Sequence, residues 1–161
     1  MTLAEAAARA AELTDERALA DLRREVAEDV EAAVRSKDFR ERVVGDRAVG
    51  QLRFVQKTEL LCRGLEDDSP SCRGAALLSI ELMSRGQLGL VNSVRPLLHS
   101  LANADPNAAV RRLAGLCLRN GSPHADTITL LGFLAEEAEE RELRVTAASV
   151  RDALKRKASA R

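Results

Sequence analysis

Side chains that commonly perform catalysis are few in this chain, and none stands among suitable partners. His99 and His124 are the only histidines. Asp126 lies two residues after His124, but no further ligand type follows at the spacing by which a helix binds a metal. Ser100, beside His99, has no strained turn to present it as a nucleophile. We therefore expect surface or helix-capping roles for both histidines.

The three cysteines show no pattern of a redox or metal site. Cys62, Cys72 and Cys117 cannot all pair within one chain, and they are too widely spaced to form a ligand set. We interpret them as small apolar residues in helix interfaces. Free thiols of this kind are typical of a reducing compartment, which predicts a cytoplasmic protein.

Carboxylates and glycines give no stronger signal for a bound ion or nucleotide. The glutamates between residues 136 and 142 lack the alternating spacing and the glycine of a calcium loop. Gly86 and Gly89 are not followed by the lysine and hydroxyl of a phosphate-binding loop. The sequence thus predicts a protein that is not an enzyme and has no cofactor or metal.

Composition favours a single all-helical domain. The chain has 161 residues, of which 45% are apolar and 31% charged, with no tryptophan or tyrosine and three phenylalanines. So few aromatic residues disfavour a sheet protein. No apolar run approaches the roughly 18 residues of a membrane span, and residues 1–10 do not resemble a signal peptide.

The apolar periodicity and the turn residues predict a short N-terminal helix followed by four helix pairs. Thr2 and Glu5 form a capping box that begins the first helix. Gly45 and Gly50 are the expected break points between two helical segments. Pro96 is expected to kink the helix that contains it. The expected helices span 15–35, 38–48, 51–66, 70–85, 87–103, 106–119, 124–137 and 139–156, and residues 157–161 are expected to form a frayed tail.

Prolines and glycines mark the expected helix ends. Ser69-Pro70, Asp105-Pro106 and Ser122-Pro123 each place a capping side chain before a residue suited to the first helical turn. Gly86 and Gly121 are expected to end helices in the left-handed conformation.

A pattern of an apolar residue, an arginine and, three positions later, an alanine recurs along the chain. The arginines are Arg73, Arg111 and Arg144, which are 38 and 33 residues apart. This period is typical of helix pairs stacked in a row. Acids precede each arginine by five or six residues, namely Asp68, Asp105 and Glu139. We hypothesise that acids and arginines form a charged ladder along the stack.

These residues resemble HEAT-type helical repeats of the short bacterial kind, which are related to armadillo repeats. Asp68 to Arg73, Asp105 to Arg111 and Glu139 to Arg144 resemble the start of the second helix of such a unit. A weaker copy is placed at Asp38, Phe39 and Arg40 with Val43. The resemblance is clear over residues 51–156 and weak over 15–48. It implies an α-solenoid of about four antiparallel helix pairs in one domain, residues 1–156.

A repeat fold without a catalytic constellation predicts a binding scaffold or adaptor for a protein or peptide. The chain has equal numbers of acidic and basic residues, whereas residues 51–120 carry nine basic and six acidic groups. Duplex DNA binding through this basic segment is the alternative, but the lack of tryptophan and tyrosine disfavours contacts to unstacked bases. Homodimerisation remains open. The residues expected to bind the partner are Arg73, Glu81, Arg85, Arg112, Arg119, Arg151 and Lys155.

Overall fold

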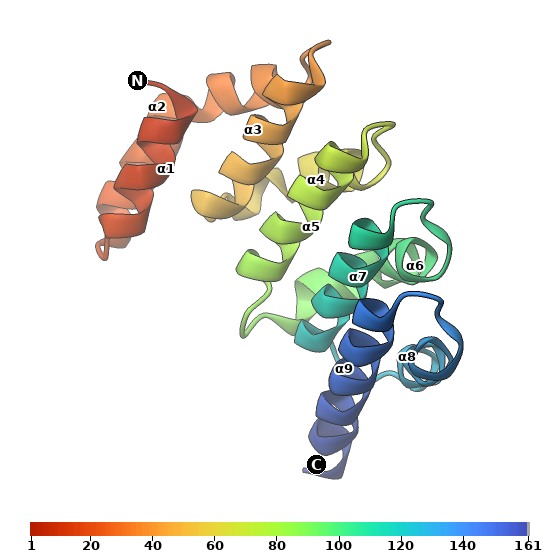
Figure 1. Ribbon diagram of the computed structural model, residues 1–161. Helices are drawn as coiled ribbons and strands as arrows, with labels where there is room; N and C mark the ends of the chain where they lie inside the picture. The colour runs from red at the N-terminus through yellow and green to blue at the C-terminus, as the bar shows by residue number, and fades with distance from the viewer. Residues whose placement is uncertain (161) are drawn as a thin grey trace. The chain divides into compact units, whose positions relative to one another are not determined.

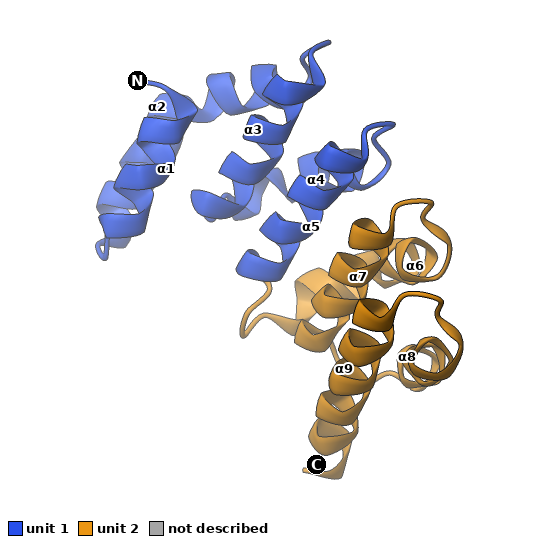
Figure 2. Cartoon of the chain, viewed as in Figure 1, with its two compact units in different colours: residues 1–83 blue, residues 84–161 orange. Residues whose placement is uncertain are grey.

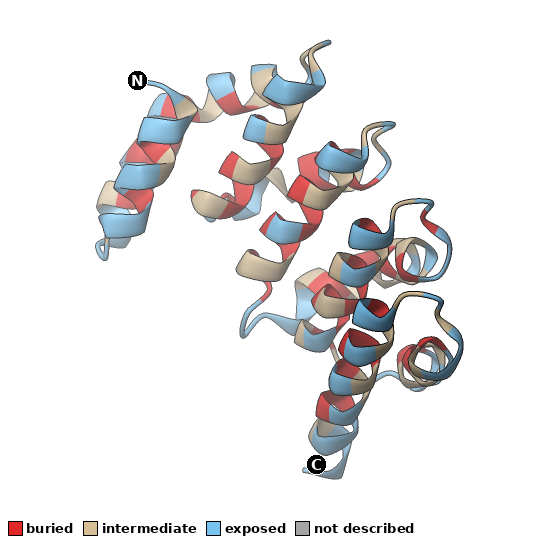
Figure 3. Ribbon diagram, in the orientation of Figure 1, coloured by how far each residue is buried: buried red, intermediate tan, exposed pale blue. Residues whose placement is uncertain are grey.

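The computed structural model describes residues 1–160, and all regular structure in this range is helical (Figure 1). The prediction of an all-helical protein is therefore confirmed. The described residues form two compact units, one ending at Met83 and one beginning at Ser84 (Figure 2). Each unit has its own core of buried aliphatic side chains (Figure 3).

The first unit is organised around one central helix. Its elements are α1 (Leu3–Glu12), α2 (Glu16–Val34), α3 (Phe39–Gln51), a 3-10 turn η1 (Val55–Lys57), α4 (Thr58–Leu65) and α5 (Pro70–Met83). Helix α3 packs against α1, α2 and α5, and α4 packs against α5. Ala6 and Ala10 of α1 are fully buried, so this helix covers one side of the first unit, as the capping box at Thr2 and Glu5 positions it to do.

The second unit consists of two helix pairs. Its elements are α6 (Leu88–Ala104), α7 (Ala108–Cys117), a 3-10 turn η2 (Leu118–Asn120), α8 (Ala125–Glu137) and α9 (Arg141–Ser159). Helix α6 pairs with α7 and α8 pairs with α9, while α7 and α9 also lie side by side (Figure 1). Helix α6 continues through Pro96.

The glycines of α3 allow close helix packing. The prediction that Gly45 and Gly50 interrupt the helical structure is therefore wrong. Both residues are buried inside one continuous helix. A Cβ atom on Gly45 would lie 2.7 Å from the backbone nitrogen of Val34 in α2, and one on Gly50 would lie 2.6 Å from the Cα of Ser79 in α5. The helix ends instead at Gln51, two residues before Arg53 adopts the left-handed conformation, with φ of 50°.

Two of the three predicted helix starts lie later than expected. Helix α5 begins at Pro70, as the sequence indicates. Helix α7 is capped by Asn107, whose side chain accepts a hydrogen bond from the Val110 N–H, and α8 is capped by His124. Asn107 and His124 carry the side-chain hydrogen-bond acceptors, and each directly follows a proline. Pro106 and Pro123 therefore lie just before the capping residue and not in the first helical turn.

The predicted helix ends were right at one glycine and wrong at the other. Gly86 has a φ of +75°, the left-handed conformation that glycine favours. Gly121 has an ordinary φ of −93°, but a Cβ atom there would lie 2.6 Å from the Cγ1 of Val91. Close approach to α6 thus explains this glycine. The predicted frayed tail is also wrong for 157–159, because α9 extends to Ser159; Arg161 lies outside the described residues.

An arginine in the first turns of α3, α5, α7 and α9 holds the loop that precedes its own helix. Each guanidinium donates from Nη1 to the backbone carbonyl six residues earlier, at 2.5 to 3.0 Å, and three of the four also donate to the carbonyl five residues earlier. The four residues are Arg42, Arg73, Arg111 and Arg144. We call this repeated arrangement the arginine clamp.

In the first unit the clamp arginine lies two residues later than the arginine that the sequence pattern indicated. Arg40 pairs with Asp38 of its own loop and is largely exposed, whereas Arg42 occupies the clamp position. The small residue three positions after Arg42 is Gly45, which replaces the alanine of the other copies. In three of the four loops, the residue whose carbonyl binds the arginine also uses its side chain to stabilise the turn. These residues are Ser36, Asp67 and Asp105, and each side chain accepts a hydrogen bond from the backbone N–H two residues further along the chain.

The charged ladder is present in part and with different acids. Two of the predicted acids, Asp68 and Glu139, accept hydrogen bonds from the arginines of their own loops through their backbone carbonyls. Arg42 instead reaches the Asp67 carboxylate of the next loop in a bidentate pair, at 2.8 and 3.1 Å. Arg111 likewise pairs with the carboxylate of Glu140. These half-buried pairs connect successive helix pairs within each unit.

Substitution of Gly50 tests the close contact between α3 and α5. We expect Gly50→Ala to lower the free energy of unfolding by about 1–3 kcal/mol, because the added methyl group overlaps the backbone of Ser79. Gly115→Ala is the matched control, since no atom lies within 4 Å of its Cβ position. The control variant should be unchanged or more stable by up to about 1 kcal/mol. Urea unfolding followed by circular dichroism measures both, and equal stabilities would contradict the close contact.

Substitution of Arg111 tests the clamp. Arg111→Met removes the bonds to the Asp105 carbonyl and to Glu140, and we expect it to lower the free energy of unfolding by about 1.5–3 kcal/mol. Arg156→Met, at an exposed position of α9, should change it by less than about 0.5 kcal/mol. Thermal and urea unfolding give the comparison. A loss for Arg111→Met no larger than for Arg156→Met would show that the clamp contributes nothing to stability.

Candidate functional site

The residues first considered for catalysis have structural roles. His124 caps α8, where its Nδ1 accepts a hydrogen bond from the N–H of Asp126 at 3.2 Å. His99 is half-buried rather than at the surface, and its Nε2 lies 2.8 Å from the Oγ1 of Thr127. Burial lowers the pKa of His99, and the nearby Arg95 lowers it further, so the ring is neutral at physiological pH.

None of the three cysteines forms a disulfide. Cys72 and Cys117 are buried and Cys62 is half-buried. Burial raises the pKa of the Cys62 and Cys72 thiols above the ordinary value, which disfavours the nucleophilic thiolate. Across residues 1–160, no three His, Cys, Asp or Glu side chains are arranged to hold a metal ion.

One carboxyl group in the first unit is strongly perturbed. Asp46 of α3 is 1% exposed, and its Oδ1 has no hydrogen-bond partner. Burial, helped by the charge of Asp67 and opposed by Arg42, raises the pKa of Asp46 to about 7. Its carboxyl lies against Gly64 of α4, where an added Cβ would approach Oδ1 to 2.9 Å. A side chain this deeply buried acts on stability and does not meet a substrate.

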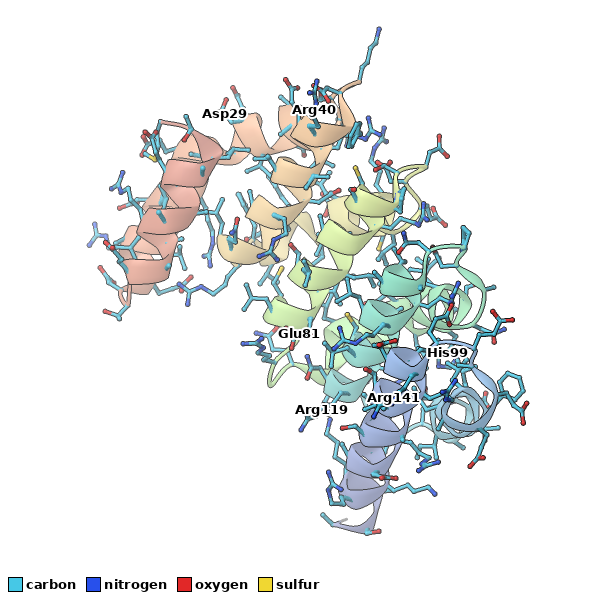
Figure 4. The ribbon with its side chains drawn as sticks, in the orientation of Figure 1. Asp29, Arg40, Glu81, His99, Arg119 and Arg141 are labelled. Carbon is cyan, nitrogen blue, oxygen red and sulfur yellow. The ribbon has the colours of Figure 1, made fainter. Side chains whose placement is uncertain are left out.

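The structure divides the seven predicted binding residues between the two units. Arg73 and Glu81 lie on α5 and are half-buried, with Arg73 engaged in the clamp. Arg85 is exposed just after α5 and belongs to the second unit. The other four residues all lie on α7, η2 and α9: Arg112, Arg119, Arg151 and Lys155. Figure 4 labels Glu81 and Arg119.

The four residues on α7, η2 and α9 do not share one surface. The Cδ of Arg151 lies 3.8 Å from the Cβ position of Gly132, so this side chain packs toward α8, and its Nε pairs with Asp152. Lys155 follows one turn later on the same side of α9. Arg112 instead donates from Nε to the Oγ1 of Thr146 at 3.1 Å, on the side of α9 that faces α7.

Helices α7 and α9 present an exposed basic surface around Arg112. A hollow of about 230 Å³ is lined by Arg112, Arg141, Glu142, Val145 and Thr146. Val145 is 58% exposed, a high value for an aliphatic side chain. Arg156 continues the exposed ridge of α9 that begins with Arg141. Arg119 is exposed on η2, and Figure 4 labels it together with Arg141. We call these residues the α7/α9 face: Arg112, Arg119, Arg141, Glu142, Val145 and Arg156.

Lys157 fixes the end of this surface. Its Nζ donates to the backbone carbonyls of Arg119 and Gly121, at 2.5 and 3.2 Å, and so joins the last turn of α9 to the end of η2. Burial, followed by the charge of Arg119, lowers the pKa of Lys157. Sequence reasoning missed Arg141, Val145 and Arg156, although their spacing of four and eleven residues along one helix marks a common face.

The two units differ in charge although the whole chain is neutral. Residues 1–83 carry 13 basic and 17 acidic side chains, and residues 84–161 carry 12 basic and eight acidic ones. The second unit is therefore net positive by four charges. Such a distribution attracts acidic partners to the second unit at moderate ionic strength.

Comparisons with known proteins do not assign the chain to a family: no family model matches it, and no match to a curated protein was found. Among residues 1–160, every helix is too short or too polar to span a membrane.

The pH dependence of stability tests the state of Asp46. Its folded pKa of about 7 exceeds the ordinary value of 3.8, so the folded state holds a proton that the unfolded state releases between these values. The stabilisation from this group is complete below about pH 4 and is lost as pH rises through 7, by up to about 1.4 kcal/mol per pH unit. Asp46→Asn, which cannot ionise, should gain roughly 2 kcal/mol relative to the wild type between pH 5 and pH 8.

Urea unfolding of both proteins at pH 5 and pH 8 measures this difference. Asp38→Asn is the control, because Asp38 has a lowered pKa and is held by Arg40 near the surface. A constant stability difference between wild type and Asp46→Asn across this range would show that Asp46 ionises normally.

Proposed function

We propose that the protein is a non-enzymatic binding module, in which the α7/α9 face holds an acidic segment of a partner protein. The observation that supports this most directly is the hollow between Arg112 and Arg141, with the exposed Val145 between them. Glu142 is the one carboxylate of its lining, and no histidine or cysteine stands beside it. The hollow offers two guanidinium groups and an apolar contact, which suits binding rather than a reaction.

The side chains of the face match a peptide carboxylate. A guanidinium is planar and donates two parallel hydrogen bonds, which fits the two oxygens of aspartate or glutamate. Arg112 binds Thr146 through Nε and lines the hollow, and no hydrogen bond is recorded for its two outer nitrogens among the described residues. Val145 adds an apolar contact for a neighbouring side chain of the bound segment.

A protein segment explains the face better than duplex DNA does. Glu142 lines the same hollow, and Asp152 lies on the same ridge of α9 as Arg141 and Arg156. These carboxylates interrupt the row of positive charge that a continuous phosphate backbone would need, whereas a peptide can place its separate carboxylates beside Arg112 and Arg141. An exposed valine at the centre also contributes little to a phosphate backbone, whereas it suits the mixed side chains of a peptide.

We further propose that the helix pairs are HEAT-like repeats stacked as an α-solenoid. The support is the arginine clamp, which recurs in α3, α5, α7 and α9 with the same offset between the arginine and the carbonyl that it holds. Equivalent loops give equivalent helix pairs, and each pair can then bury its apolar face against the next. We place the protein in the cytoplasm, because Cys62, Cys72 and Cys117 form no disulfide.

Binding of an acidic peptide tests the proposal. The probe is a fluorescein-labelled peptide of about 12 residues with repeated Glu-Glu-Leu units, followed by fluorescence anisotropy at low ionic strength. We expect saturable binding to the wild type and at least about tenfold weaker binding to the double variant Arg112→Glu, Arg141→Glu. The double variant Arg17→Glu, Arg24→Glu, at two exposed positions of the first unit, changes the net charge by the same amount and should leave the affinity unchanged.

A labelled duplex DNA of similar charge is titrated in parallel. Preference for the duplex, or peptide affinity that the double variant does not reduce, would contradict the proposal. Light scattering of the same samples tests for homodimerisation, since a mass equal to one chain at all concentrations would exclude it.

A further inference from the structure

The second unit has another hollow, lined by other residues than the α7/α9 face, at the loops that join the helices of each pair. Its volume is about 340 Å³, and its lining comes from the end of α6, the end of α8 and the two loops that follow them. Leu134 and Leu143 are almost fully buried, whereas Phe133 is 56% exposed. We call this hollow the loop pocket. An exposed aromatic ring beside an apolar floor is an unusual surface in a chain with only three phenylalanines.

The polar groups of the loop pocket determine which side chain it suits. Glu137 and Glu139 line it, and both are exposed with no ion pair to the described residues. Arg111 also lines it, but this guanidinium already donates to the Asp105 carbonyl and to the carboxylate of Glu140. The cation of the lining is therefore engaged, while two carboxylates remain available. The pocket suits a positive group and disfavours an anion.

We propose that the loop pocket binds an arginine side chain from a basic segment of a partner protein. The apolar stem of an arginine packs on Leu134 and Leu143. Its planar guanidinium stacks on the face of Phe133, where the ring attracts a cation. The same group donates hydrogen bonds to the carboxylates of Glu137 and Glu139 at the rim.

The dimensions of the loop pocket agree with a single long side chain. Its volume is at the lower end of the range for small-molecule sites, and it opens to solvent along the loops. A protein segment passing over the loops inserts one side chain while its backbone stays outside. This mode of binding places an aromatic and arginine contact at the centre, which is common among the strongest contacts of protein interfaces.

The loop pocket and the α7/α9 face carry opposite charges and use different residues. The face presents Arg112 and Arg141, and the pocket presents Phe133, Glu137 and Glu139. The inference is independent of the proposed function, because an acidic segment cannot serve as the ligand of the pocket. Variants of one site therefore act as controls for the other.

A single tryptophan gives a direct measure of binding. The chain contains no tryptophan or tyrosine, so Phe133→Trp creates one fluorophore at the pocket and keeps an aromatic face that attracts cations well. The probe is an acetylated, amidated peptide of alternating arginine and glycine. The matched control peptide carries citrulline, which has nearly the same shape as arginine and no charge.

We expect a saturable change in tryptophan emission with the arginine peptide and none with the citrulline peptide. Adding Glu137→Gln and Glu139→Gln to the tryptophan variant should weaken binding about tenfold or more. Adding Arg112→Glu and Arg141→Glu should leave it no weaker. Equal responses to both peptides, or full binding after removal of the two carboxylates, would overturn the proposal.

Amide chemical shifts of the unmodified protein provide a second measurement that needs no tryptophan. We expect the arginine peptide to shift the signals of residues 133–140 and not those of residues 145–149. Removal of the ring by Phe133→Ala should abolish these shifts, with circular dichroism showing that the helices remain. Shifts confined to other residues, or none at saturating peptide, would also overturn the assignment.

Discussion

The arginine clamp is the interaction on which the local geometry of each helix pair depends. The guanidinium binds two loop carbonyls in three of the four loops and one in the fourth, and in two loops it also reaches a carboxylate of the neighbouring pair. A buried or half-buried carbonyl without a donor is costly, so the arginine sets where the loop must turn. The exposed sides of α7 and α9, and the loop pocket behind them, are positioned by the same contacts.

Much of the helical structure could be predicted from sequence because its signals are local. Apolar spacing, capping side chains and the left-handed Gly86 depend on neighbours within a few residues. The roles of Gly45 and Gly50 could not be predicted because they depend on residues far away in the sequence. The two glycines allow α2 and α5 to approach α3 closely and do not interrupt α3. The register of the first repeat was misplaced at Arg40 because Arg42 is followed by glycine instead of alanine, and only the contact with the loop carbonyls identifies it.

The candidate sites were harder to predict because they depend on which side of a helix meets a neighbour. Arg112 and Arg151 looked equivalent in sequence, yet one contacts Thr146 and the other packs toward Gly132. Phe133 carried no signal beyond being one of few aromatic residues. Asp46 has the spacing of a core position, but its unpaired Oδ1 follows only from the packing of three helices around it. Long-range packing, rather than propensity, decides these cases.

The constant offset of the clamp limits how such a protein can change its length. The arginines are 31, 38 and 33 residues apart, so the distance between repeats varies. The six-residue step from arginine back to carbonyl does not vary. Insertions can therefore be tolerated in the first helix of a pair or in the connection to the next pair, whereas one extra residue between the turn and its arginine would leave the carbonyls without a donor. Evolution of a longer array is thus expected to duplicate the turn and its helix together.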